Sequence, residues 1–180
     1  MKPALGVTEP GAIAFAVAKA RSFTKGDIKK VNVAMNSGMY KNAFTCGIPN
    51  SNEVGNVFAA ALGVVAGNAD KGLESLADVT PEDNVKAQEM IDQGKVTVEL
   101  SGITSRIFIE ATVETEEDKA IVTIRDSHTN ITKITVNDKV ELETEDEKKT
   151  EEDGGEEEAH SIHKYTLQQL YDYVTTVDIE

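Results

Sequence analysis

The sequence predicts an α+β fold in which helices of small residues pack against an antiparallel sheet. The N-terminal part contains two stretches that are rich in Ala and Gly and nearly free of charge. The later part alternates apolar and polar residues with a period of two, the pattern of half-buried strands. A hydrophobic content of 39% is sufficient for the core of one domain of 180 residues.

The first predicted helix covers Pro10–Ser22. Thr8 has a hydroxyl that can cap this helix, and Glu9 places a carboxylate near the positive end of the helix dipole. Proline suits the first helical position, where no N–H is needed. Because Gly11–Ala18 contains no charged side chain, we expect a central helix rather than a surface helix.

Strand and turn signals alternate with helix signals in the next part of the chain. A strand is predicted over Ile28–Met35, and turn residues follow at Asn36-Ser37-Gly38. Met39–Thr45 is either a return strand or an irregular loop. Glu53–Gly67 predicts a second small-residue helix that packs closely against the first, and a short helix is expected at Lys71–Leu76.

A further helix is expected from Thr80, a capping residue followed by proline and two acids, to about Gln93. Its inward residues are predicted to be Val85, Met90 and Ile91. The period-two pattern then predicts the strands Val96–Leu100, Ile107–Glu114, Ala120–Asp126, Ile131–Val136 and Lys139–Leu142. One face of the sheet is expected to pack on the helices, and the other face is expected to be partly exposed to solvent.

Three regions follow from this reading. Residues 1–140 are expected to form the α+β domain, and residues 141–164 an acidic mobile loop, because eleven acids and two lysines lie between Glu141 and Glu158. Residues 165–180 are expected to form a C-terminal helix that is cut short. Thr166 is predicted to cap it, and an apolar stripe runs along it through Leu167, Leu170, Tyr171 and Val174.

The formal net charge of −14 argues against binding to nucleic acid or to anionic membranes. No signal peptide or membrane-spanning segment is visible in the sequence. Cys46 is the single cysteine, which excludes a disulfide framework and predicts a cytoplasmic location. One thiol is also too few for an iron–sulfur cluster, which takes about three or four, so no metal site is predicted in this chain.

Several residues can be interpreted either as parts of a functional site or as purely structural residues. Thr8 and Glu9 either line a substrate site or only cap a helix. Ser37, Lys41 and Asn42 either bind a substrate carboxylate or form a solvated hairpin. Cys46 is either a lone ligand, a nucleophile or an incidental thiol.

The segment Asp126–Ile131 carries the second group of candidates. His128 after a strand is suited to act as a base near neutral pH, whereas Thr129 and Asn130 equally suit a turn held by side-chain hydrogen bonds. His160 and His163 beside the acidic segment form either a weak metal pair or a solvated face.

These motifs resemble the L-cysteine desulfidase family, which is related to the alpha chain of iron–sulfur L-serine dehydratases. The resemblance rests on A-L-G-x-T-E-P, on the segment Ser37–Asn42, on T-P-E-D at Thr80–Asp83, on H-T-N-I at His128–Ile131 and on the final T-V-D-I-E. The family usually has Cys where this chain has Val7. It implies an α+β fold, with Glu9 and His128 as catalytic candidates and a substrate-binding set of Thr8, Ser37, Lys41, Asn42, Thr129 and Asn130.

The resemblance covers the N-terminal half of the family. It implies an amino-acid lyase that gives pyruvate and ammonia from cysteine or serine, with a 4Fe-4S cluster held by cysteines of the other half. Two hypotheses follow. This chain is either one part of such a lyase, inactive alone and completed by a C-terminal half, or a diverged non-catalytic domain that binds a small amino acid or scaffolds a partner. A homodimer is the other partner we expect.

Overall fold

The computed structural model describes residues 4–103, 106–144 and 165–176. The chain forms two compact units, residues 1–146 and residues 147–180. The helices and strands of the first unit follow the chain in the order α1 (Thr8–Arg21), β1 (Ile28–Asn36), α2 (Ser37–Ala43), α3 (Asn56–Ala66), the 3-10 helix η1 (Ala69–Glu74), α4 (Pro81–Asp92), β2 (Val96–Gly102), β3 (Phe108–Thr115), β4 (Lys119–Arg125), β5 (Ile131–Val136) and β6 (Lys139–Glu143). The second unit contains α5 (Leu167–Thr176).

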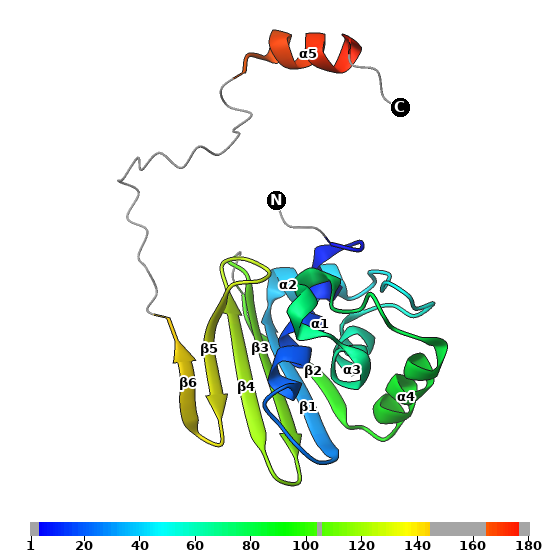
Figure 1. Ribbon diagram of the computed structural model, residues 1–180, viewed down its shortest axis with the longest axis vertical. Coiled ribbons are helices and arrows are strands. Elements are labelled where there is room, and N and C mark those ends of the chain that lie inside the picture. Colours follow the sequence, from blue (N-terminus) through cyan, green and yellow to red (C-terminus); the bar gives the residue numbers. More distant parts are fainter. Residues whose placement is uncertain (1–3, 104–105, 145–164, 177–180) are drawn as a thin grey trace. The chain divides into compact units, whose positions relative to one another are not determined.

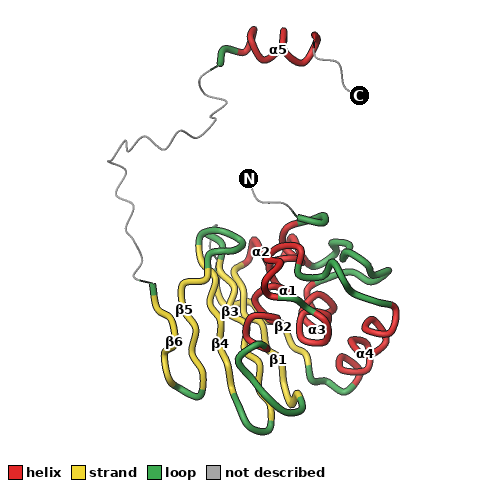
Figure 2. The backbone as a smooth tube through the Cα atoms, viewed as in Figure 1, coloured by secondary structure: helices red, strands yellow, loops and turns green. Residues whose placement is uncertain are grey.

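The described strands form one six-stranded sheet in the order β2-β1-β3-β4-β5-β6 (Figure 1). α1 and α3 lie against the same face of this sheet, and α4 packs outside α3 (Figure 2). The predicted α+β class is therefore confirmed. No helix in the described part of the chain is both long enough and apolar enough to span a bilayer.

The sheet is mixed rather than wholly antiparallel. β2 pairs with β1 in parallel, with Val33 beside Val98, while all other neighbouring strands are antiparallel. The chain between β1 and β2 contains α2, α3, η1 and α4, and a crossover of this kind returns the chain in the same direction. The antiparallel prediction thus holds for β1 and β3–β6.

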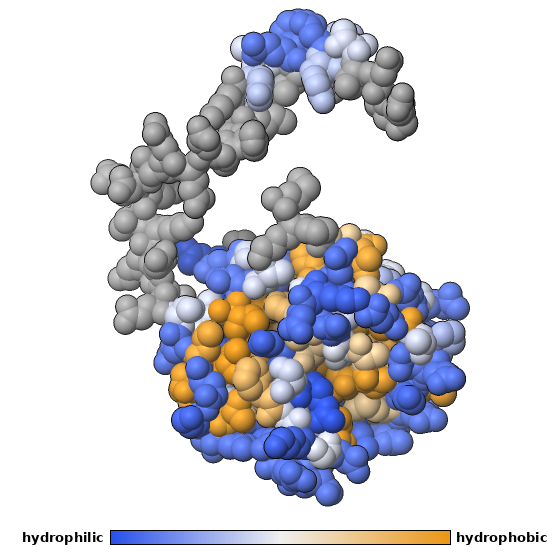
Figure 3. All heavy atoms as spheres, viewed as in Figure 1, coloured by the Kyte–Doolittle hydropathy of each residue, from blue (hydrophilic) through white to orange (hydrophobic). Residues whose placement is uncertain are grey.

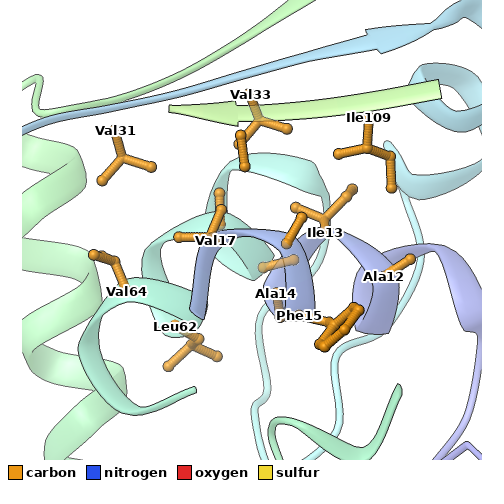
Figure 4. Close-up of a cluster of buried hydrophobic side chains, with 14 of the residues drawn as sticks. Ala12, Ile13, Ala14, Phe15, Val17, Val31, Val33, Leu62, Val64 and Ile109 are labelled. Atoms are coloured by element: carbon orange, nitrogen blue, oxygen red, sulfur yellow. The ribbon is translucent and has the colours of Figure 1, made fainter. Parts of the chain in front are cut away.

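The two small-residue helices form the centre of the core, as predicted. In α1 every residue from Pro10 to Ala18 is buried. A Cβ added to Gly63 of α3 would lie 2.7 Å from the carbonyl oxygen of Ala14, so the two helix backbones approach to a distance that only glycine allows. Ile13 and Val17 of α1 point toward the sheet, where Val33 and Ile109 lie (Figure 4).

The predicted alternation of the sheet is also confirmed. Along β3, Ile109, Ala111 and Val113 are fully buried, while the residues between them are partly exposed. The buried set faces the helices and the other set faces solvent, because successive side chains of a strand point to opposite faces.

Three details differ from the sequence predictions. Ser37–Ala43 is helical rather than a turn followed by a strand or loop, because Met39 and Ala43, four residues apart, both enter the core. Thr8 does not cap α1, since Val7 is the N-cap residue and no side chain bonds the first turn. Val85 is 60% exposed, and Ala87 is the buried residue of α4 instead.

The predicted helix caps at Thr80 and Thr166 are confirmed. The Thr80 hydroxyl accepts a hydrogen bond from the backbone N–H of Asp83, whose carboxylate accepts one from the N–H of Thr80 in return. In the second unit, Thr166 and Gln169 form the same reciprocal pair at the start of α5. Residues 145–164, which include most of the predicted acidic loop and both His160 and His163, lie outside the described residues.

Candidate functional site

The segments that carry most of the predicted site residues meet at one end of the sheet. β1 ends at Asn36, and α2 follows at once. In the sheet register Met35 lies opposite Ile109, and Phe108 lies opposite Arg125. β4 therefore ends at the same edge of the sheet as β1, with β3 between them, and the turn that contains His128 lies at the same end of the sheet as α2 (Figure 1).

The starts of α1 and α3 lie at this end as well. The close approaches pair Ala14 with Gly63 and Ala18 with Gly67, so the two helices run in parallel and begin together. Asn56, the first residue of α3, donates a hydrogen bond from Nδ2 to the carbonyl oxygen of Tyr40 in α2 at 3.1 Å. The starts of α1 and α3 thus flank α2.

A hydrogen bond joins the first two predicted segments. Asn42 Nδ2 of α2 donates to Glu9 Oε1 of α1 at 3.1 Å, across 33 residues of sequence. The Thr8 hydroxyl donates to the other carboxylate oxygen of Glu9 at 3.4 Å. The Cys46 thiol donates to the carbonyl oxygen of Asn42. Because Glu9 lies in the first turn of α1, its carboxylate is also close to the positive end of the helix dipole.

Ser37 and Lys41 lie on the same short helix as Asn42. Ser37 is its first residue and is half-buried, whereas Lys41, next to Asn42 in sequence, is exposed. Lys41 therefore carries a positive charge on the helix that supplies Asn42. The structure thus joins Thr8, Glu9 and Asn42 by hydrogen bonds and places Ser37 and Lys41 on the same helix as Asn42.

The second predicted segment forms the turn between β4 and β5. Asn130 closes this turn, because its Nδ2 donates to the carbonyl oxygen of Arg125 at 3.1 Å. His128 and Thr129 are half-buried in the same turn. No hydrogen bond within the described part of the chain joins His128 to Glu9. Asn130 therefore holds the turn that contains His128, and this turn lies at the same end of the sheet as the start of α1.

Sequence reasoning missed two buried polar residues that position this end. Asn36 is 2% exposed, and its Oδ1 accepts a hydrogen bond from the backbone N–H of Phe108 at 3.1 Å. Asn56 is also 2% exposed, and its Oδ1 has no partner among the described residues. The available signal was an asparagine directly after an apolar strand, and another directly after Gly55 at a helix start.

Among the hollows on the molecule, two of more than 500 Å³ lie elsewhere and contain none of the predicted site residues. One, of about 560 Å³, lies between the loop around Asn52 and α4. The other, of about 580 Å³, lies on the open face of the sheet, next to Arg125 and Lys133. Both are lined mainly by polar side chains, and of the residues in the family motifs only Pro81 lines either of them. The candidate site thus rests on the meeting of the motifs rather than on a hollow.

Val7 and Cys46 decide whether an iron–sulfur cluster fits this chain. Val7 is 46% exposed at the N-cap of α1, and an alkyl side chain can neither transfer a proton nor bind iron. The described residues contain no group of three or more His, Cys, Asp or Glu residues that could hold a metal ion. With one cysteine in the sequence, the residues of this chain do not fit a 4Fe-4S cluster.

The chain is similar to UPF0597 proteins. It is 35% identical to one from Clostridium botulinum strain Hall over 182 aligned residues, which cover 100% of this chain and 42% of the relative. It is 36% identical to one from Caldanaerobacter subterraneus subsp. tengcongensis over 178 residues, which cover 99% of this chain and 41% of that relative. The chain therefore spans about two fifths of the length of these relatives. Neither a family model nor a solved structure matches it.

Proposed function

We propose that this chain is one part of an amino-acid lyase of the L-cysteine desulfidase or L-serine dehydratase type and is inactive alone. The observation that carries the proposal is the hydrogen bond between Glu9 and Asn42. It joins the T-E-P turn to the segment Ser37–Asn42, the first two motifs of the resemblance. The length of the relatives supports the second half of the proposal, because this chain matches 42% of the Clostridium botulinum protein.

The reaction has two steps. Elimination removes the α-proton and the sulfide or hydroxide leaving group from the amino acid, which gives hydrogen sulfide or water and an aminoacrylate. Water then hydrolyses the imine tautomer of the aminoacrylate to pyruvate and ammonia. The family's cluster supplies a Lewis acid when it is present. Since this chain does not carry its ligands, the roles proposed for the residues below are substrate binding and proton transfer.

The proposed roles follow from charge and position. The Glu9 carboxylate accepts hydrogen bonds from the substrate ammonium, and Asn42 keeps that carboxylate oriented through its 3.1 Å hydrogen bond. Lys41 pairs with the substrate carboxylate. His128, at the same end of the sheet, takes up or delivers a proton near neutral pH. Thr8, Ser37 and Thr129 complete the polar lining.

The test is anaerobic reconstitution with iron and sulfide. This chain, the remainder of the Clostridium botulinum relative as a separate polypeptide, and their mixture are each assayed for pyruvate from cysteine and from serine. We expect pyruvate from the mixture alone. A mixture that contains both folded polypeptides and releases no pyruvate contradicts the lyase, and pyruvate from this chain alone contradicts the need for a partner.

The sequence offers a matched control for the Glu9–Asn42 pair. Asn32 Nδ2 donates to Glu99 Oε1 at 2.9 Å between β1 and β2, so this is the same carboxamide–carboxylate pair away from the motifs. The kcat/KM for pyruvate release is measured in the mixture of the two polypeptides. We expect Asn42→Ala in this chain to lower it at least about tenfold, and Asn32→Ala to change it less than about twofold. Equal effects of the two substitutions contradict the proposed role of Asn42.

The alternative function is a diverged domain that binds a small amino acid, or scaffolds a partner, without catalysis. Val7 favours it, because this exposed alkyl side chain stands where the family usually has a reactive thiol. Calorimetric titration of this chain with cysteine and with serine separates the two functions. Binding that depends on Glu9 and Lys41, together with a mixture that never releases pyruvate, supports the alternative.

A further inference from the structure

We propose that the end of the sheet around Glu9 is a docking surface for the polypeptide that UPF0597 relatives carry outside the region matched here. This inference rests on the proposed function, because it names the partner of the same site. The surface consists of large apolar side chains that are 43% exposed or more and that come from this end, and we call it the end surface: Leu5, Val7, Phe44, Val54, Leu100 and Ile103.

The end surface is contiguous with the elements that carry the candidate site. Leu5 and Val7 immediately precede α1, and Phe44 ends α2, where its ring stacks on Tyr40 with centroids 6.2 Å apart. Val54 lies just before α3 and forms a bridge with Gly47. Figure 3 shows apolar residues at the surface above the start of α1. Leu5 and Val7 therefore adjoin the first turn of α1, which presents Glu9, and Phe44 caps the helix that carries Asn42.

The remaining two residues come from the end of β2. Leu100 lies beside Met35, and Gly102 lies beside Asn36 in the parallel register. β2 thus ends where α2 begins, and Ile103, the next residue, is 90% exposed. An isoleucine with that exposure contributes almost nothing to the core of this unit.

Physical chemistry favours a protein partner for this surface. Large exposed apolar side chains scattered singly are ordinary, but six gathered at one end of a small domain are typical of an interaction site. Of the remaining large apolar side chains exposed in the first unit, Val85 lies on α4, and Val140 and Leu142 lie on β6.

The comparisons indicate which partner it is. The relatives align with this chain over 42% and 41% of their own length, so more than half of each has no counterpart here. A polypeptide that covers the end surface also encloses Glu9, Asn42 and Lys41 and excludes water from them. A second copy of this chain covers the same side chains but brings no thiols beyond one more Cys46.

The experiment measures binding separately from catalysis. The probe is the remainder of the Clostridium botulinum strain Hall relative, the part outside the 182 aligned residues, titrated against this chain by calorimetry. We expect Ile103→Asp and Phe44→Asp to weaken binding at least about tenfold, because each buries a charge at the interface. The matched controls are Val85→Asp and Val140→Asp, at 60% and 45% exposure, which we expect to weaken it less than about twofold.

Hydrogen exchange provides a second measurement on the unmutated chain. We expect the remainder to slow exchange at residues 5–9, 40–46 and 100–103, and to leave α4 unchanged. Equal losses from the end-surface variants and the controls overturn the inference. So does a remainder that is folded and shows no binding, or a stable homodimer that Ile103→Asp dissociates.

The two proposals fail in distinguishable ways. Binding that the end-surface variants weaken, in a mixture that releases no pyruvate, supports the docking surface and contradicts the lyase. Pyruvate release that the end-surface variants leave unchanged supports the lyase and contradicts the docking surface. Circular dichroism of each variant checks that it is folded, because substitution of an exposed side chain usually leaves stability almost unchanged.

Discussion

Between α1 and α3 the chain packs its backbones together through glycine and alanine, whereas at the end where both helices begin, polar side chains join the segments. In the first region the carbonyl oxygen of Ala14 lies where Gly63 has no Cβ. In the second, Asn36, Asn42 and Asn56 each bond a different segment of the chain. The comparison shows two ways of fixing a position. Close backbone packing sets where α1 and α3 begin, and individual side-chain hydrogen bonds then hold the neighbouring segments at that end of the sheet.

The largest effect is expected where the backbones touch. Gly63→Ala places a Cβ 2.7 Å from the carbonyl oxygen of Ala14 and 2.8 Å from its Cα, and neither atom can move without shifting α1. We expect the free energy of unfolding to fall by about 1–3 kcal/mol or more. Urea unfolding measures it, with Gly102→Ala as the control, because nothing lies within 4 Å of a Cβ there. Equal losses for the two variants would contradict the close approach.

A comparable or smaller loss is expected for Asn36→Ala at the sheet end. The substitution leaves the backbone N–H of Phe108 without the acceptor that it has at 3.1 Å, in a region where Asn36 is 2% exposed. We expect a loss of about 1–3 kcal/mol in the free energy of unfolding. Asn32→Ala, which breaks a surface pair, is the control and should change it by about 0.5 kcal/mol or less.

The Glu9–Asn42 pair should contribute little to stability, in contrast to Asn36. Asn42 is exposed and Glu9 is half-buried, so water competes for both groups. We expect Glu9→Gln and Asn42→Ala each to lower the free energy of unfolding by less than about 1 kcal/mol. A double-mutant cycle by urea unfolding measures the coupling of the pair. A coupling above about 2 kcal/mol would show a structural clamp instead of a site that can turn toward a ligand.

The smallest effect is expected at the opposite end of the sheet, in the turn between β3 and β4. Asn137 Nδ2 and the backbone N–H of Lys25 both donate to the Asp118 carboxylate, each at 2.9 Å, and they lower the pKa of Asp118 from its ordinary value of 3.8. A lowered pKa stabilises the fold above the unfolded-state pKa, and this contribution is lost as the pH falls through the folded-state value.

Asp118→Asn removes that pH-dependent contribution. We expect the slope of the thermal midpoint against pH to become shallower below about pH 4, with little change at neutral pH beyond the loss of the turn's hydrogen bonds. Thermal unfolding over an acid series measures it, and Asp138→Asn in the β5–β6 turn is the control. An unchanged acid slope would show that the turn does not hold the charged form.

Much of the fold was predictable because the determining interactions are local. The run of uncharged small residues from Gly11 to Ala18 specifies a helix that must be buried, and the alternation in β3, β4 and β5 specifies both the strands and their inward faces. Thr80, Pro81 and Asp83 specify the start of α4 within a single turn. In each case the relevant contacts lie within a few residues of one another.

The candidate site was predictable only as a set of separate motifs. Glu9, Asn42 and His128 were each selected from their own segment, but nothing in the sequence places Glu9 within hydrogen-bond distance of Asn42. Asn36 and Asn56 were missed as buried residues that position the site. The sequence around an asparagine at a strand end or a helix start is the same whether that residue is exposed to solvent or buried in the core.

The sequence by itself determined which segments are buried helices, which are strands and where α4 begins, because those properties follow from side-chain periodicity and capping. The tertiary structure decided that Ser37–Ala43 is a helix, that β2 runs parallel to β1 and that Glu9 meets Asn42. Seven residues with mixed turn and helix signals have no strong conformation of their own. The core selects the helix because that conformation buries Met39 and Ala43 on one face, and the same helix brings Asn42 to Glu9.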